Sequence, residues 1–104
     1  MIGYKLVRKL QDGTLRPLFI ERTRTLPIGR WIDANDVPTK GYAHRPGWHI
    51  LAKPHAPHLS KRGRVWIEVE FDAHKATTHL RPASQGGTWY TAPLMRIRRE
   101  VKGQ

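Results

Sequence analysis

The chain contains no cysteine among its 104 residues. Disulfide bonds, zinc sites built on thiolates and cysteine nucleophiles are therefore excluded. No apolar run approaches the ~18 residues that a membrane-spanning helix requires. The first residues, MIGYKLVRKLQDG, also lack the uninterrupted hydrophobic segment of a signal peptide. We therefore expect a cytoplasmic protein that has no membrane partner.

Acidic residues are scarce. Eight Asp and Glu stand against nineteen Lys and Arg, which gives a formal net charge of +11 with neutral histidine. The excess is densest in residues 36–64, which hold six bases and one acid. A surface of this charge attracts polyanions, namely nucleic acid, nucleotides or an acidic protein face.

The length of the chain fits one small domain that covers residues 1–104. A domain of this size has a modest core. Four Trp, three Tyr and two Phe nevertheless supply bulky side chains for that core. Disordered chains usually lack such aromatics, so we expect a folded domain.

The clearest strand pattern is RVWIEVEF, residues 64–71. Small apolar residues alternate there with tryptophan and glutamate, which is typical of a half-buried strand. The E-x-E of Glu68 and Glu70 resembles the acidic motif of arginine-modifying ADP-ribosyltransferases, but no S-T-S stretch accompanies it. We interpret the two glutamates as a solvated strand face that also offsets nearby bases.

Two further segments are predicted to form strands. Residues 4–20 read as a hairpin around a two-residue turn at Asp12 and Gly13. Because Pro17 lacks a backbone donor, the second strand of that hairpin should leave the ladder there or lie at an edge.

Residues 88–101 are predicted to form one or two strands broken near Pro93. The alternation in this segment places Met95, Ile97 and Val101 on one face, and Arg96, Arg98 and Glu100 on the other.

The remaining segments are rich in turn residues. Residues 26–32 are expected to form a short strand or turn that packs Ile28, Trp31 and Ile32. Residues 72–87 form a polar connector with one helical turn at 73–77. Dense proline and glycine argue against a long helix between residues 38 and 57. The predicted class is mainly β, or β-rich α+β: a small antiparallel sheet or half-barrel with long ordered loops and little helix.

The segment HRPGWHILAKPHAPH, residues 44–58, holds four of the six histidines: His44, His49, His55 and His58. Imidazole suits zinc, copper and nickel. Structural zinc normally adds cysteine and catalytic zinc often adds a carboxylate, yet no acid lies between residues 36 and 68. We therefore expect no metal and no other cofactor.

A hydrolytic alternative uses the same histidines. His58-Leu59-Ser60 matches one H-x-S/T element of two-histidine phosphoesterases, but the second element is missing. A looser arrangement, with His49 and His58 as general acid and base, remains open as the enzymatic alternative.

The favoured site is a basic and aromatic loop that binds phosphate groups. Bases stack on aromatic rings, while Arg and Lys engage phosphates. Core packing is expected for at least one of Trp48 and Trp66, so Trp48 would stack only if it is exposed. The predicted ligand-binding residues are Tyr42, Arg45, Trp48, His49, Lys53, His55, His58, Arg62 and Arg64.

Four segments, RPGWH (45–49), PHAPHLS (54–60), GRVWIEVE (63–70) and GGTW (86–89), resemble a family of small uncharacterised phage and prophage proteins. The resemblance implies a phage accessory protein of the anti-defence type and transfers no catalytic residue. The leading hypothesis is a non-enzymatic binder of nucleic acid or of a nucleotide signal in the host cytoplasm. The alternative partner is a host defence effector, bound as a protein by an inhibitor resembling anti-CRISPR proteins.

Overall fold

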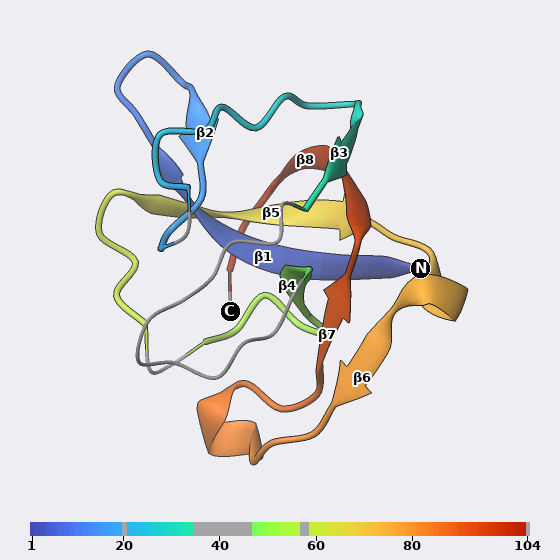
Figure 1. Cartoon of the computed structure of the whole chain (residues 1–104). Helices are drawn as coiled ribbons and strands as arrows, with labels where there is room; N and C mark the ends of the chain where they lie inside the picture. The colour runs from blue at the N-terminus through green and yellow to red at the C-terminus, as the bar shows by residue number, and fades with distance from the viewer. Residues whose placement is uncertain (20, 35–46, 57–58, 104) are drawn as a thin grey trace.

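The computed structural model describes residues 1–19, 21–34, 47–56 and 59–103. Within them lies one antiparallel sheet that is not closed, and the mainly β class is confirmed (Figure 1). The helical segments of the described residues are two single 3₁₀ turns, and none of them could cross a membrane. The strands are β1 (Ile2–Lys9), β2 (Leu15–Arg16), β3 (Trp31–Asp33), β4 (Trp48–Leu51), β5 (Arg64–Glu70), β6 (Thr77–His79), β7 (Trp89–Ala92) and β8 (Leu94–Val101).

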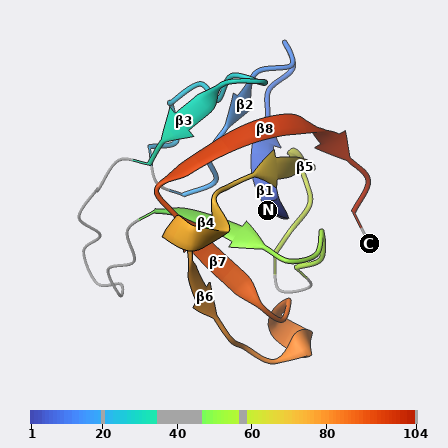
Figure 2. The same cartoon turned by 90° about the vertical axis from the view of Figure 1, so that its right-hand side faces the viewer.

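The sheet curls because of how its last two strands are placed. Its order is β3-β8-β5-β1-β4-β7-β6, and β2 pairs with β1 outside this path. Only Pro93 separates β7 from β8 along the chain, yet three strands lie between them in the sheet. The sheet must therefore bend until its two wings approach each other. Figure 2 shows β8 arching over one side of the molecule, with β4 and β7 on the opposite side.

The predicted hairpin forms, but its turn is one residue longer than expected. The N–H of Leu10 donates to the carbonyl of Thr14, and the N–H of Gly13 donates to the carbonyl of Leu10. The loop thus has three residues and ends on Gly13 at φ +89°, a left-handed conformation that favours glycine. As a result Arg8 lies opposite Arg16. The strand ends before Pro17, as predicted.

Strand β4 lies in the segment predicted to be a loop. Gly47 precedes it at φ +106°, and a Cβ atom there would lie 3.0 Å from the carbonyl oxygen of Ala92 on β7. A glycine is therefore needed for the chain to enter the sheet this close to its neighbour. The glycines and prolines around β4 predicted a loop, but four residues between them form a strand.

Two apolar clusters cover the two faces of the sheet. The cluster inside the curl includes Val7, Ile50, Ile67, Met95 and Ile97. The cluster on the other face contains Leu6, Leu18, Leu51, Ala56, Trp66 and Trp89. Strand β5 is consequently buried on both faces along its middle, instead of on one face as predicted.

Strand β8 changes face at a bulge. Val69 pairs with Ile97 and Glu68 pairs with Arg99, so Arg98 is an extra residue on β8. Met95 and Ile97 face the inner cluster, but Val101 packs against the outer one. The prediction that all three share a face was wrong, because the bulge shifts the alternation by one residue.

Two other local predictions were partly wrong. In the segment 26–32, Ile32 is buried on β3, but Ile28 and Trp31 are exposed. The connector 72–87 contains the 3₁₀ turn η1 (Ala73–Lys75), close to the expected helical turn, a second turn η2 (Ala83–Gln85) and the edge strand β6. Strand β6 was missed because polar residues fill it and only pairing with β7 holds it.

Candidate functional site

The predicted binding residues divide among different parts of the fold. Tyr42, Arg45 and His58 lie outside the described residues, as does His44. The others are described, and they do not form one surface.

Trp48 and His49 are adjacent on β4 and therefore point to opposite faces of the sheet. The indole of Trp48 is buried in the inner cluster and donates a hydrogen bond of 2.9 Å to the carbonyl of Ile32. Trp66 is buried as well. Core packing, expected for at least one of these tryptophans, describes both of them. His49 is exposed, and its ring lies 5.0 Å from that of Trp89.

Lys53 and His55 follow β4 in a tight turn, in which the N–H of His55 donates to the carbonyl of Lys53 at 2.8 Å. Lys53 is exposed and His55 is half-buried. Arg62 is exposed in the loop before β5, and Arg64 begins β5. Among the described members of the predicted set, Arg62 and Arg64 are the two that lie beside further arginine side chains.

Three arginines stand side by side across three strands. Arg8 on β1 lies directly opposite Arg16 on β2 and also directly opposite Arg64 on β5. Residues that face each other in antiparallel strands share one face, with Cβ atoms about 5 Å apart. We call Arg16, Arg8 and Arg64 the arginine row. It lies where the end of β1, the start of β5 and β2 meet, at the upper left of Figure 1.

Backbone carbonyls hold the row in place, but no carboxylate of the described residues forms an ion pair with it. Arg8 donates through Nε to the carbonyl of Pro17 at 3.2 Å and through a terminal nitrogen to the carbonyl of Arg22. Arg64 donates to the carbonyl of Ser60 at 2.9 Å. The Nε of Arg16 is buried and has no hydrogen-bond partner. The Nε1 of Trp66 and the Nε of Arg81 share this property, so it does not distinguish the row.

The row also shows the electrostatic effect of its own crowding. The pKa of Arg8 lies below the ordinary arginine value, first because the group is partly desolvated and then because Arg22 and Arg16 repel its charge. Like charges directly opposite each other in a sheet are destabilising. Asp12 senses the charge of Arg16, but hydrogen bonds from Thr14 are the main reason that the pKa of Asp12 is low. Among the described residues, the row is therefore an array of positive charge without an ion-pair partner, in which backbone carbonyls hold Arg8 and Arg64.

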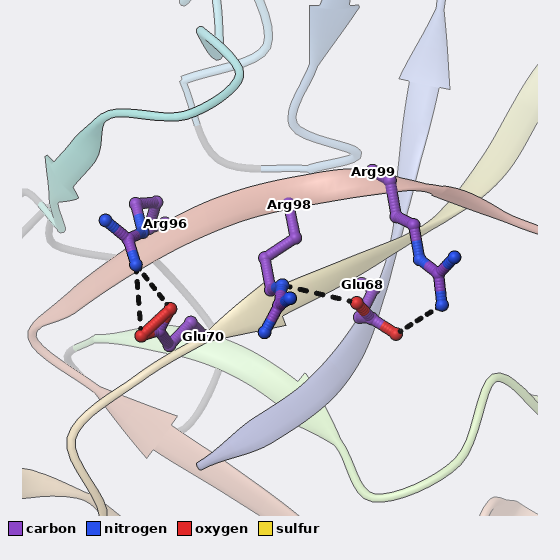
Figure 3. Close-up of polar contacts among 5 residues, drawn as sticks. All are labelled: Glu68, Glu70, Arg96, Arg98 and Arg99. Carbon is purple, nitrogen blue, oxygen red and sulfur yellow. Dashed lines mark hydrogen bonds and ion pairs between the residues drawn. The ribbon is translucent and has the colours of Figure 1, made fainter.

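Strand β8 carries a second group of arginines, which glutamates neutralise. We call Glu68, Glu70, Arg96, Arg98 and Arg99 the β8 cluster (Figure 3). One terminal nitrogen of Arg96 donates to both carboxylate oxygens of Glu70, at 2.6 and 3.2 Å. Nitrogens of Arg98 and Arg99 lie 3.5 and 3.3 Å from carboxylate oxygens of Glu68. The hydrogen bond from Arg96 is the main cause of the lowered pKa of Glu70.

The β8 cluster corrects one prediction and confirms another. Glu68 is buried with only 11% of its side chain exposed, so a solvated face does not describe it. Both glutamates do offset nearby bases, as expected. The remaining ion pairs of the described residues are Lys9 with Glu100 and Arg24 with Glu21. Among the described residues, the arginines of the row therefore have no carboxylate partner, whereas the three arginines of β8 share two glutamates and keep a smaller excess of positive charge.

Aromatic rings accompany both groups of arginines. Phe19 is 65% exposed, and the guanidinium of Arg64 lies 5.7 Å from its ring centre. Trp31 is 49% exposed, and the guanidinium of Arg96 lies 5.0 Å from its ring. Guanidinium groups at such distances interact with aromatic faces, and both kinds of group also engage nucleobases.

Two histidines gather on one buried tryptophan. His79 stacks on Trp89 at 4.3 Å and hydrogen-bonds Thr91 at 3.0 Å, while His49 contacts the same indole. Arg81 lies 5.2 Å from the ring of Trp89. No group of three or more His, Asp or Glu suited to a metal occurs in the part of the chain that the structure describes.

Lys5 lies inside the curl of the sheet. Its ammonium group donates to the carbonyl of His49 at 3.0 Å and lies 5.8 Å from the ring of Trp48. Burial lowers the pKa of Lys5 from 10.5 to about 8. The charged form of this lysine is thus less favourable in the folded protein than in the unfolded chain.

This lowered pKa predicts a pH dependence of stability. Between about pH 8 and 10.5 the unfolded chain still binds the Lys5 proton that the folded protein has released, so the free energy of unfolding rises with pH. We expect the stability of the native protein relative to the Lys5→Met variant to increase over this interval. Denaturant unfolding of both proteins at a series of pH values measures it. Parallel stability profiles would contradict the burial of this ammonium group.

Three residues at or beside the row were not predicted from the sequence: Arg8, Arg16 and Phe19. A signal for the two arginines was present, since both flank the predicted hairpin turn. The two-residue turn, however, would have placed Arg16 opposite Lys9, and the one-residue shift of the actual loop brings it opposite Arg8. The partner on the other side, Arg64, is distant in sequence and meets Arg8 only through sheet pairing.

Comparisons of the chain with protein-family models, with curated proteins and with solved structures found no match. The structure itself defines the class of protein: a small, mainly β domain with an open, curled antiparallel sheet.

Proposed function

We propose that this protein is a non-enzymatic binder of a phosphate-rich partner, a nucleic acid or a nucleotide, and that the arginine row is its main contact. The observation that carries the proposal is the row itself. Three guanidinium groups stand in cross-strand register and have no carboxylate partner among the described residues.

The chemistry of the row favours phosphate. A guanidinium presents several donors in a planar fork that matches the oxygens of a phosphate, and it stays charged at every physiological pH. Arg8 and Arg64 already have part of their donors fixed by backbone carbonyls, so little side-chain freedom remains to be lost on binding. Arg22 and Arg62, both exposed, add positive charge next to the row.

The proposal extends to the biological setting implied by the resemblance to phage and prophage proteins. A small basic binder of this kind would act in the host cytoplasm, where it would sequester a nucleic acid or a nucleotide signal of a defence system. The protein alone suffices for such a role, because sequestration needs affinity and no turnover.

Binding measured against salt concentration tests the proposal. The protein is titrated with a single-stranded oligonucleotide, a duplex, a nucleoside triphosphate and a cyclic dinucleotide between roughly 50 and 200 mM salt. For a single strand, the logarithm of the association constant should fall by about 0.7 per phosphate contacted for each unit of log salt. Salt-insensitive binding, or no binding to any of these ligands, would refute it.

A further inference from the structure

We infer that the partner of the arginine row is a single-stranded nucleic acid whose unpaired bases stack on Phe19 and Trp31. This inference rests on the proposed function and makes the ligand class specific. It starts from the exposed aromatic side chains of the described residues, which are these two. The other tryptophans, Trp48, Trp66 and Trp89, are buried.

The two exposed rings share one arrangement. Each has a guanidinium over it, Arg64 at 5.7 Å from Phe19 and Arg96 at 5.0 Å from Trp31. Arg64 has no carboxylate partner among the described residues and offers a phosphate contact beside Phe19, whereas Arg96 already pairs with Glu70 beside Trp31. Pairs of an arginine and an exposed ring are what proteins use to bind single strands with little sequence preference.

The two pairs lie on one face of the sheet, at opposite ends of β5. Arg64 begins this strand, and Glu70, the partner of Arg96, ends it. Even-numbered positions of a strand share a face, and Trp31, Arg96 and Glu70 are successive cross-strand neighbours. Six residue steps of ~3.3 Å separate the two ends by roughly 20 Å.

The space between the two pairs is also basic. Arg98 and Arg99 are 52% and 70% exposed, and within the described part of the chain they share one carboxylate, that of Glu68. Figure 3 shows the three arginines of β8 following one another along the strand. Phosphates can therefore follow β8 from Trp31 towards the arginine row.

The surface beside Trp31 is hollowed. A depression of about 300 Å³ is lined by Trp31, Asp72, Lys75, Pro93 and Leu94. Its walls combine an indole and aliphatic groups with one base, Lys75, and one acid, Asp72, so the depression suits an uncharged nucleobase and not its phosphate. A duplex keeps its bases stacked on each other, so it would meet the arginines but not the rings. A single strand uses both.

The fluorescence of Trp31 reports directly on this contact. We titrate the protein with an oligothymidylate of about eight nucleotides, within the usual site size of small β domains. Stacking should quench the emission of the exposed Trp31 and leave that of the buried tryptophans. In Trp31→Leu the quenching should disappear and the affinity should fall roughly tenfold. Phe19→Leu should show a similar loss of affinity but keep the quenching.

Leu80→Ala is the matched control, because Leu80 is an exposed apolar side chain that belongs to neither pair. It should bind like the native protein. A hairpin duplex of the same number of phosphates should bind more weakly and be insensitive to both aromatic substitutions. If the duplex binds as tightly as the single strand, or if quenching persists in Trp31→Leu, the inference is wrong.

The two proposals fail in different ways. Should the aromatic substitutions have no effect while neutralising the arginine row abolishes binding, the single-strand inference falls and the proposed function stands. Should no phosphate-rich ligand bind at all, both fall.

Discussion

Replacing Arg16 and Arg64 together with glutamine is expected to weaken binding of a single-stranded oligonucleotide about a hundredfold, because each guanidinium lost removes charged hydrogen bonds of ~1.5–3 kcal/mol. The salt dependence should become shallower by about 0.7 for each arginine. Arg8 is left in place, since it holds the loop through the carbonyls of Pro17 and Arg22. Isothermal titration or anisotropy at several salt concentrations measures both effects.

The same double variant should not be less stable than the native protein. Arg16 carries a buried donor without an acceptor, and it lies opposite another arginine. Glutamine keeps a polar amide at the position of Nε but removes the positive charge, so it relieves the repulsion between Arg16 and Arg8. Weaker binding combined with equal or higher thermal stability is the signature of a residue retained for function. Arg16→Gln alone should already show this pattern.

Lys53→Gln provides the control for each single substitution, because it removes one exposed positive charge outside the row. We expect only a small effect on binding. If Lys53→Gln weakens binding more than Arg64→Gln does, the contact belongs to the histidine-rich segment and not to the arginine row. The predicted binding residues Tyr42, Arg45 and His58 would then be the next to test.

Replacing Gly3 with valine is expected to destabilise the fold by several kcal/mol, although valine favours strands and Gly3 lies within β1. A Cβ atom at Gly3 would collide with Cγ2 of Ile50 and would lie 3.0 Å from Phe71 and 3.1 Å from the carbonyl oxygen of Leu51. Ile50 and Phe71 are fully buried, so neither can move into free space. Strand β1 meets β4 at this point, and the collision would separate them.

Thermal unfolding measures the effect, with an expected fall of the midpoint by roughly 10 °C or more. Thr77→Val is the control, since it adds valine to the exposed edge strand β6. Gly3→Ala should cost less than Gly3→Val, and it should cost less again in an Ile50→Ala background, because alanine lacks the Cγ2 atom that collides. Additive effects of Gly3→Ala and Ile50→Ala would mean that the two positions do not touch.

Strand predictions succeeded where a local pattern fixes the structure. The alternation in residues 64–71 gave β5, and the missing donor of Pro93 separated β7 from β8. These predictions failed where a segment becomes a strand only because it pairs with a neighbouring strand. Strand β4 sits between proline and glycine, and β6 is wholly polar, so neither has a local signal strong enough to distinguish it from a loop.

The candidate site could be predicted only in part for the same reason. The composition predicted a polyanion partner, and Arg62 and Arg64 were among the residues chosen. Clustering along the sequence then drew attention to the four histidines of residues 44–58. Closeness in the folded protein instead joins Arg64 to Arg8 and Arg16, through hydrogen bonding between strands far apart in the chain.

By itself, then, the sequence determined the β class, the hairpin, the strongest strand and the excess of positive charge. These follow from side-chain alternation, turn residues and composition, all of which act within a few residues. The tertiary structure alone decided the hairpin register, the bulge that turns Val101 to the other face, and the burial of Trp48 and Glu68. A one-residue shift moves a side chain across the sheet, and only the pairing of distant strands fixes that shift.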